Sequence, residues 1–177
     1  MKETAQVGSA DGLPVIVTDT REQSPLAFPH LKSERGTLAT GDYSAKGLEH
    51  RLAVERKSMA DMVGSLTHER ARFMAELQRM RAYECRRLLL IGTQMELKAI
   101  LARRAVKLEQ IRGSLACIDA CMVPVVWVQD AAQAALEVER LAFWCWREVR
   151  RAAGLPLPAS PAWARAGMLG CWNTEGR

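Results

Sequence analysis

Residues 52–61 read LAVERKSMAD, and this stretch predicts where a strand ends and a helix begins. An apolar tripeptide leads into the charged triplet ERK, as expected of a buried strand that reaches the end of a sheet. Side chains two positions apart project from the same face of a strand, so Glu55 and Lys57 share a face. Ser58, with Asp61 three residues later, matches a variant of the capping box and predicts a helix N-terminus. The charges are therefore either a solvated cluster before a helix or the edge of an active site.

The residues before this stretch predict a group of strands. Residues 13–19 (LPVIVTD) form a short apolar run that ends in an acid, which indicates a buried strand. Residues 20–37 carry two prolines and a glycine and are interpreted as a loop. Residues 37–43 (TLATGDY) and 50–57 (HRLAVERK) predict two more strands, joined by a turn at 44–49. We expect these strands to form an antiparallel meander.

The residues after it alternate between helices and strands. Besides the helix that starts at Ser58, the apolar pattern predicts helices over 69–83, 95–102, 108–122 and 131–152, and strands over 86–92 and 123–130. Such alternation implies parallel strands connected by crossover helices. The predicted fold is therefore of the α/β class, with a mixed β-sheet covered by helices.

The composition excludes several classes of protein. Of the 177 residues, 49% are hydrophobic, which is enough for a core, and no apolar run approaches the about 20 residues that span a bilayer. The first residues, MKETAQVGSADG, lack the apolar region of a secretory signal. We expect a cytoplasmic protein that is not secreted. One domain is expected over 13–152, between a flexible leader at 1–12 and a loosely ordered tail, rich in Pro, Ala and Gly, at 153–177.

The charge and the reactive side chains give weaker signals. A net charge of +5 and clusters of arginine are compatible with a polyanionic partner without identifying it. The histidines His30, His50 and His68 pair with no nucleophile and are expected on the surface. No C-x-x-C pair is present, so the cysteines are predicted to be buried free thiols of a reducing compartment: Cys85, Cys117, Cys121, Cys145 and Cys171.

Four acids stand at strand ends or turns, namely Asp19, Asp42, Glu55 and Asp61. Two carboxylates that converge repel each other unless a divalent cation such as Mg²⁺ or Mn²⁺ lies between them. A lysine beside such a cation can position the attacking water and stabilise charge on a phosphate oxygen. An acid on one strand and Glu-x-Lys on the next resembles the layout of the PD-(D/E)XK metal-dependent nucleases. The Glu-x-Lys pattern alone is weak, because it occurs by chance in most proteins.

A longer string is more specific. GDY at 41–43 and VERKSMAD at 54–61 together spell G-D-x(12)-E-R-K-x(3)-D. This resembles the signature of the nuclease domain of the XPF family of structure-specific endonucleases. VTDTRE at 17–22 is similar to the first motif of that family, and HERARFMAELQRM at 68–80 is similar to its helix after the active site. The resemblance covers about 15–128 in element order and implies a restriction-endonuclease-like fold.

The resemblance implies a role for each matching residue. Asp42 and Glu55 are the expected principal ligands of Mg²⁺ or Mn²⁺, joined by the backbone carbonyl of Arg56. Asp19 is expected to be a further acid in or near the coordination shell, and Lys57 is expected to assist the water and the scissile phosphate. For Asp19 an alternative stays open, in which it only ends a strand and binds backbone of the next turn.

Other residues are expected to support the site. Arg21 and Glu22 are its expected polar partners, with Arg21 a phosphate contact. Arg56 and Asp61 are expected to orient the loop and to cap the helix, although Asp61 serves equally well as a cap alone. The residues expected to contact DNA are Arg21, Arg56, Arg70 and Arg72.

The sequence departs from the cellular members of that family. No helix–hairpin–helix signature or helicase region is present, so the chain resembles the stand-alone nucleases of phages and bacteria. The run LAFWCW at 141–146 covers most of a helix circumference, so the helix at 131–152 needs cover on more than one side. A three-sided slot in the core, or cover from Trp163 and Trp172 of the tail, would meet this need, and a homodimer is the favoured alternative.

The function expected from these observations is a divalent-metal-dependent DNA endonuclease. Its substrate is expected to be branched, flap or junction DNA in repair, recombination or replication, and no nucleotide cofactor is expected. One alternative is a non-catalytic DNA-binding or scaffolding subunit with the same fold, although the retained Asp42, Glu55 and Lys57 argue against it. A regulatory module recruited through the Trp-containing tail is a third hypothesis.

Overall fold

The computed structural model describes residues 12–166, and six strands in this part of the chain form one sheet. Their order across the sheet is β2-β1-β3-β4-β5-β6. The strands are β1 (Ile16–Asp19), β2 (Ser33–Gly36), β3 (Tyr43–Ala45), β4 (Leu52–Ser58), β5 (Cys85–Ile91) and β6 (Val125–Val128).

The sheet is mixed, as the sequence predicted. β3 pairs antiparallel with both β1 and β4, which confirms the antiparallel first half. β4, β5 and β6 run parallel to one another, which confirms crossover connections in the second half. The carboxyl ends of β4 and β5 therefore meet at one edge, where Lys57 lies opposite Leu90.

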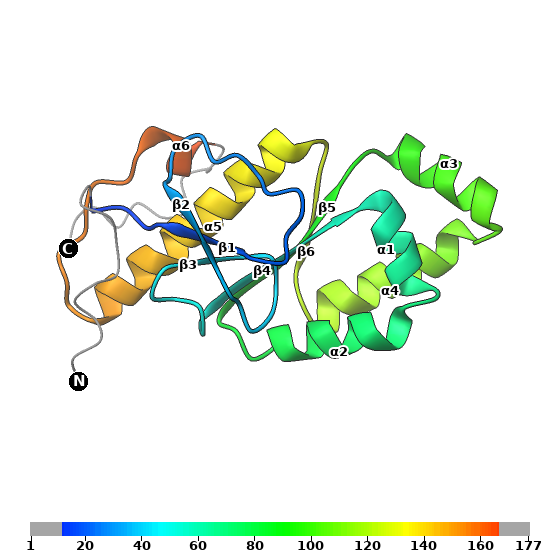
Figure 1. The fold of residues 1–177 in the computed structure, drawn as a ribbon, viewed down its shortest axis with the longest axis horizontal. Coiled ribbons are helices and arrows are strands. Elements are labelled where there is room, and N and C mark those ends of the chain that lie inside the picture. Colours follow the sequence, from blue (N-terminus) through cyan, green and yellow to red (C-terminus); the bar gives the residue numbers. More distant parts are fainter. Residues whose placement is uncertain (1–11, 167–177) are drawn as a thin grey trace.

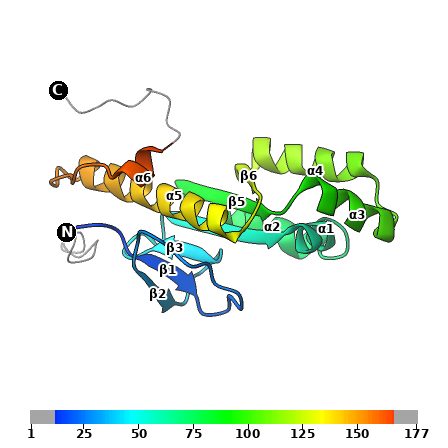
Figure 2. The same cartoon turned by 90° about the horizontal axis from the view of Figure 1, so that it is seen from above.

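Helices cover both faces of the sheet (Figures 1 and 2). They are α1 (Met59–Leu66), α2 (Arg70–Met80), α3 (Gln94–Arg104), α4 (Leu108–Cys121), α5 (Ala131–Ala152) and α6 (Ala162–Arg165). One core is formed by the helices α1, α2, α3 and α4 together with Ala53, Leu88 and Leu90 of the sheet. The other joins α5 with Val54 and Leu89, so consecutive residues of β4 and β5 alternate between the two cores.

Two strand predictions were wrong in the first half of the chain. β2 lies inside the segment 20–37 that was interpreted as a loop, and it pairs parallel with β1. The strand predicted over 37–43 begins only at Tyr43, because Gly41 has φ of +78°, a left-handed backbone. A Cβ atom at position 41 would lie 2.9 Å from the carbonyl oxygen of Val54, so a glycine is required at this close approach of two strands.

The switch from strand to helix after β4 is confirmed. Ser58 is the N-cap of α1, and its side chain accepts a hydrogen bond from the main-chain N of Asp61. The buried face of α1 carries Met59, Met62, Val63, Ser65 and Leu66. The helix predicted over 131–152 has those bounds in the structure, and α2, α3 and α4 differ from prediction by a few residues at their ends. The short α6 lies in the predicted tail and was not predicted.

Residues 153–166 return along α5 and cover it. The indole Nε1 of Trp144 donates to the carbonyl oxygen of Ala164 at 3.3 Å, and Arg150 donates to that of Pro156 at 2.9 Å. Trp163 stacks on the ring of His30 at 4.9 Å between centroids. Of the predicted leader and tail, 1–11 and 167–177, including Cys171 and Trp172, lie outside the described residues.

The prediction of buried thiols was wrong for two cysteines. Cys145 is buried in the core and Cys85 is half-buried, whereas Cys117 and Cys121 are exposed on α4. The described part of α4 buries the stripe Ile111, Leu115 and Ile118 instead, which turns both thiols to solvent. Among residues 12–166, none of the helices combines the length and apolar character that crossing a bilayer requires.

Candidate active site

The pairing of β3 with β4 brings two acids together. Tyr43 lies opposite Val54, and the main-chain N of Asp42 donates to the carbonyl oxygen of Val54 at 2.8 Å. The main-chain N of Arg56 donates to Oδ2 of Asp42 at 2.8 Å. Asp42 therefore stands beside Glu55, its cross-strand neighbour, because antiparallel register places opposed side chains on one face.

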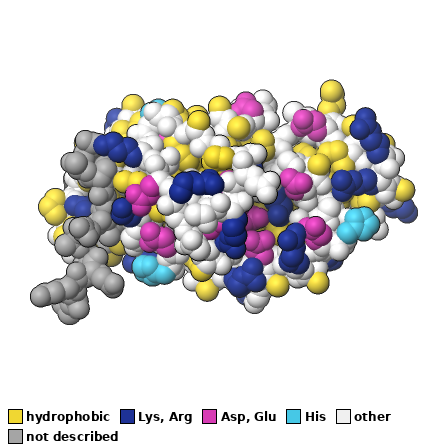
Figure 3. All heavy atoms as spheres, in the orientation of Figure 1, with side chains coloured by type: hydrophobic (Ala, Val, Ile, Leu, Met, Phe, Trp, Pro, Cys, Tyr) yellow, Lys and Arg dark blue, Asp and Glu magenta, His cyan; other side chains and the backbone are white. Residues whose placement is uncertain are grey.

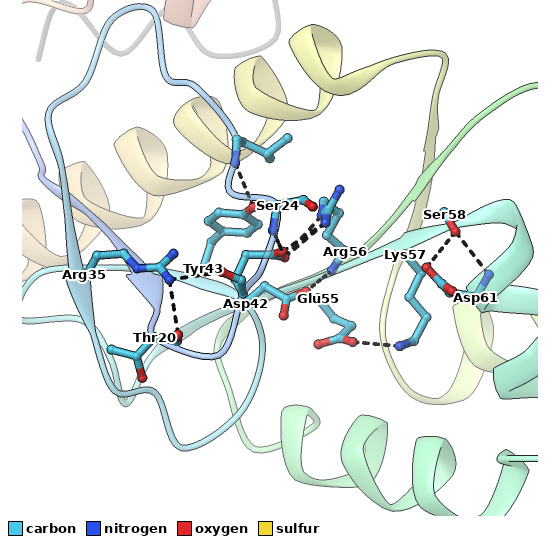
Figure 4. Close-up of polar contacts among 12 residues, drawn as sticks. Thr20, Ser24, Arg35, Asp42, Tyr43, Glu55, Arg56, Lys57, Ser58 and Asp61 are labelled. Atoms are coloured by element: carbon cyan, nitrogen blue, oxygen red, sulfur yellow. Dashed lines mark hydrogen bonds and ion pairs between the residues drawn. The ribbon is translucent and has the colours of Figure 1, made fainter.

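Glu55 and Lys57 share the face of β4 that turns toward α2, as the sequence predicted. Nζ of Lys57 lies 3.0 Å from Oε1 of Glu55, and Figure 4 shows both side chains pointing to the same side of the strand. The Glu55 side chain is 6% exposed and that of Lys57 is 15% exposed. The same ammonium lies 4.8 Å from the centroid of the Phe73 ring on α2. The structure thus brings Asp42, Glu55 and Lys57 together.

The pKa values of both carboxyl groups, Asp42 and Glu55, are raised. Burial raises the pKa of Asp42, against the lowering effect of the hydrogen bond from the main chain of Arg56. Burial also raises the pKa of Glu55, and the charge of Asp42 adds to that increase. Lys57 lowers both pKa values without cancelling the increase. Both carboxyl groups therefore bind protons more tightly than ordinary carboxyl groups do.

This donor set fits a hard divalent cation. The buried Glu55 and the half-buried Asp42 supply the oxygen ligands that Mg²⁺ and Mn²⁺ prefer, and a bound cation would favour their ionised forms against the burial that raises their pKa values. Within the described part of the chain, no group of three or more His, Cys, Asp or Glu side chains is arranged to hold a metal ion.

Asp19 is engaged in its own loop. Its Oδ1 accepts from the main-chain N and from Nε of Arg21, at 2.8 and 2.7 Å. Its Oδ2 accepts from Nη2 of Arg21 and from the main-chain N of Leu38, at 3.1 and 2.7 Å. These bonds, the side-chain bond from Arg21 first, lower the pKa of Asp19 to about 2. Its contacts favour the alternative in which it ends a strand and binds the next turn.

Glu22 and Arg56 form a second polar pair on the opposite face of β4. Nη2 of Arg56 lies 3.1 Å from Oε1 and 3.2 Å from Oε2 of Glu22, and Oε1 also accepts from the main-chain N of Ser24. Both side chains are largely shielded from solvent, at 22% and 7% exposure. The pair ties the loop after β1 to the strand that carries Glu55.

Asp61 contacts Ser58, and Figure 4 shows no contact between Asp61 and Asp42 or Glu55. Oγ of Ser58 donates to its Oδ2 at 2.7 Å, and its own main-chain N donates back to Oγ at 3.1 Å. These reciprocal bonds satisfy groups at the start of α1. The arrangement favours the interpretation of Asp61 as a helix cap.

The arginines predicted to contact DNA have different surroundings. Arg21 is 69% exposed beside Asp19, whereas Arg56 is held by Glu22. Arg70 donates to Ser114 at 3.2 Å, and Arg72 is ion-paired with Glu69. Figure 3 shows basic and acidic side chains intermixed over the middle of this face. Two later arginines, Arg147 and Arg150, bind carbonyl oxygens of the segment after α5.

Two contacts were missed from the sequence. The helical stripe placed Phe73 in the core, where it is 2% exposed, and gave no sign that its ring faces Lys57. His30 is exposed, as expected, but its Nδ1 also lies 2.8 Å from Oε2 of the buried Glu139. Glu139 is fully buried and also accepts from the main-chain N of His30 and of Leu31. A glutamate within an amphipathic helix gives no signal for partners about a hundred residues away.

Comparison with known proteins identifies a matching family and a similar fold. The family model described as "ERCC4 domain" matches residues 18–141. Two solved structures, titled "XPF from Aeropyrum pernix, complex with DNA" and "XPF from Aeropyrum pernix", are similar with TM-scores of 0.59 and 0.57, both at 22% identity. They cover 75% and 84% of this chain, and 64% and 67% of theirs, so the chain spans less than two thirds of the DNA-bound structure. A search of curated protein sequences finds no significant match.

Proposed function

The chain belongs to the ERCC4 domain family, and on that premise we propose that it is a divalent-metal-dependent endonuclease that hydrolyses phosphodiester bonds of DNA. One observation carries the proposal, namely the convergence of Asp42, Glu55 and Lys57 on one face of the sheet, with Lys57 Nζ 3.0 Å from Glu55 Oε1. DNA as the substrate is supported by the similar archaeal structure, whose title names a complex with DNA.

Asp42 and Glu55 are the proposed ligands of Mg²⁺ or Mn²⁺, with the main-chain carbonyl of Arg56 as a further ligand. When bound, the cation supplies Lewis-acid polarisation of the phosphate and a more acidic water. The chain contributes the position of both carboxylates. Oδ2 of Asp42 accepts a hydrogen bond from the main-chain N of Arg56, and the Glu55 side chain is buried.

Lys57 is the proposed phosphate-side cation. Its ammonium group carries three donors, and one of them is directed to Glu55. The remaining donors can bind a non-bridging phosphate oxygen and stabilise the negative charge that develops there during hydrolysis. A lysine suits this task because its charge is compact and is held at the end of a long side chain.

The other predicted residues take supporting roles in this proposal. Asp19 acts as a positioning residue, because its carboxylate holds the main-chain N of Leu38 and the guanidinium of Arg21. Arg56 positions the loop after β1 through Glu22, and Asp61 caps α1. None of these three residues is proposed to touch the reacting phosphate.

The proposed substrate is branched, flap or junction DNA in repair, recombination or replication. Arg21 is well placed for a phosphate contact, since it is largely exposed while its neighbour Asp19 fixes its direction. Arg70 and Arg72, at the start of α2, are further candidates for phosphate contacts. Contacts of this kind raise affinity for any DNA and make it depend on salt.

A homodimer also stays a proposal. The helix at 131–152 supports it less than expected, because Trp163 and its neighbours cover α5 within the chain. The large hydrophobic side chains exposed among the described residues are Met95 and Trp127, and Trp127 lies on β6 at the edge of the sheet. Concentration-dependent sedimentation of wild type and Trp127→Lys tests whether this edge takes part in an interface.

One cleavage experiment tests the proposed function. Labelled flap, fork and linear duplex DNA are incubated with Mg²⁺, with Mn²⁺ and with EDTA. Metal-dependent cleavage is expected for wild type and is expected to be lost in Asp42→Asn. Asp119→Asn is the matched control, because Asp119 is an exposed acid on α4 that accepts from Val125 far from the site. Binding without cleavage on every substrate would instead support a non-catalytic DNA-binding subunit.

A further inference from the structure

Lys57 is held from two sides, and only one of them is a carboxylate. Its ammonium lies 3.0 Å from Oε1 of Glu55 and 4.8 Å from the centroid of the Phe73 ring. A cation over the face of an aromatic ring is attracted by the negative charge density of that face, and the attraction grows when water is largely excluded. The side chain of Lys57 is only 15% exposed, so this contact operates in a partly dry setting.

The ring itself is rigidly placed. Phe73 is 2% exposed and packs in the core formed by α1, α2 and the sheet. It lies on the buried face of α2 with Leu77 and Met80, which follow it by four and seven residues and therefore lie on the same side of the helix. Because the core fixes the position of the ring, the contact restricts where the flexible Lys57 side chain can lie.

Glu55 is a poor sole anchor for Lys57. The same carboxylate is the proposed ligand of the divalent cation, and a metal-bound oxygen attracts an ammonium group less strongly. The neutral ring of Phe73 competes for neither the cation nor the phosphate. It restricts the lysine without neutralising the charge that the phosphate requires.

We propose that Phe73 is a positioning residue of the active site, which holds the ammonium group of Lys57 toward the scissile phosphate through a cation–π contact. The effect of this contact on DNA cleavage rests on the proposed function, whereas the contact itself does not. It adds to that function a buried aromatic residue on α2 that acts on the reaction through Lys57.

A series of fluorinated phenylalanines at position 73 tests the proposal. Fluorine withdraws charge from the ring face while nearly preserving its size, so the cation–π attraction falls stepwise and the packing stays. The single-turnover rate of DNA cleavage at saturating DNA is expected to fall with each added fluorine, by about two- to thirty-fold for the trifluorinated ring. DNA affinity is expected to stay within about twofold, because the Phe73 ring is buried in the core and is not itself a DNA contact.

Phe143 supplies the matched control. It is fully buried in the core of α5, where its ring contacts Trp144 and Trp163, and within residues 12–166 no Lys or Arg lies over this ring. The same fluorinated series at position 143 is expected to leave the cleavage rate unchanged. Equal losses in both series, or an unchanged rate across the Phe73 series in an active enzyme, would overturn the inference.

A second readout needs neither metal nor DNA. The ring current of Phe73 should shift the terminal resonances of Lys57 upfield in the NMR spectrum, with Lys57→Arg providing the assignment. The shift is expected to persist in Phe73→Tyr and to vanish in Phe73→Leu. Its absence from folded wild type would overturn the inference without touching the proposed function, whereas a wild type that cleaves no DNA would overturn the proposed function itself.

Discussion

Oδ2 of Asp42 accepts a hydrogen bond of 2.8 Å from the main-chain N of Arg56, the residue that directly follows Glu55. A carboxylate on one strand is therefore fastened to the backbone of the strand that carries its partner acid. Because the donor is a main-chain group, this contact depends on the register of β3 against β4 and not on a mobile side chain. Replacing the side chain of Arg56 is therefore expected to keep this hydrogen bond.

The metal-free protein is expected to lose stability as the pH rises. The folded pKa of Asp42 is about 6 against an ordinary 3.8, and that of Glu55 about 8 against 4.5. Groups with raised folded pKa values stabilise the fold fully below their ordinary values and lose that contribution as the pH rises through the folded values. In EDTA, Tm should therefore fall as the pH rises from about 4 to about 8, by on the order of 10 °C.

Divalent cations should reverse this loss. Adding Mg²⁺ or Mn²⁺ at the upper end of that pH window should raise Tm, since the cation binds the ionised carboxylates of the folded state. Glu55→Gln removes the larger pKa increase and should flatten the pH dependence in EDTA. Differential scanning calorimetry of both proteins gives the comparison. A pH profile of wild type as flat as that of Glu55→Gln would contradict the electrostatic description of the pair.

Lys57 should matter for cleavage far more than for binding. Lys57→Met keeps an unbranched apolar chain over Phe73 and removes the charge, so the cleavage rate should fall by about 10²–10³-fold. Lys57→Arg should recover little, because the planar guanidinium does not match a compact ammonium held 3.0 Å from Glu55. Single-turnover cleavage and fluorescence anisotropy separate the two effects. Weakened DNA binding that accounts for the whole loss would argue against a role in the chemistry.

Asp19 and Asp42 should respond differently to the same change. Asp19→Asn places an amide where four N–H groups now donate, which should cost about 2–3 kcal/mol of unfolding free energy. The increase of Tm on adding Mg²⁺ should persist in this variant and should be lost in Asp42→Asn. Urea denaturation and calorimetry measure the two quantities. Loss of the Mg²⁺ effect in a folded Asp19→Asn would restore Asp19 as a metal ligand.

The sequence predicted the central part of the site because the relevant interactions are local. Glu55 and Lys57 share a face by the alternation of β4, and Ser58 caps the helix that follows it. Asp42 could be joined to them only through the resemblance to a known signature. Its actual position depends on the pairing of Tyr43 with Val54, which no local pattern specifies.

What the sequence missed depends on distant partners. β2 consists of Ser33–Gly36, with the first three residues exposed, so no apolar pattern reveals it and its backbone pairing with β1 alone makes it a strand. The cover of α5 shows the same limit. Its aromatic run predicted a partner, but Trp163 and the carbonyl oxygens of the following segment meet that need inside the chain. Periodicity shows that a face is buried and does not identify what buries it.

Glu22 and Arg56 should be energetically coupled, because both are largely shielded and meet in a two-pronged contact. Glu22→Gln keeps the oxygen that accepts from Ser24, and Arg56→Gln keeps the main-chain donor to Asp42. A double-mutant cycle by urea unfolding in EDTA should give a coupling of about 1–3 kcal/mol. The exposed pair Arg151–Glu148 is the control, and its coupling should stay below about 0.5 kcal/mol. Equal couplings for the two pairs would show that the loop after β1 is not held to β4 through this contact.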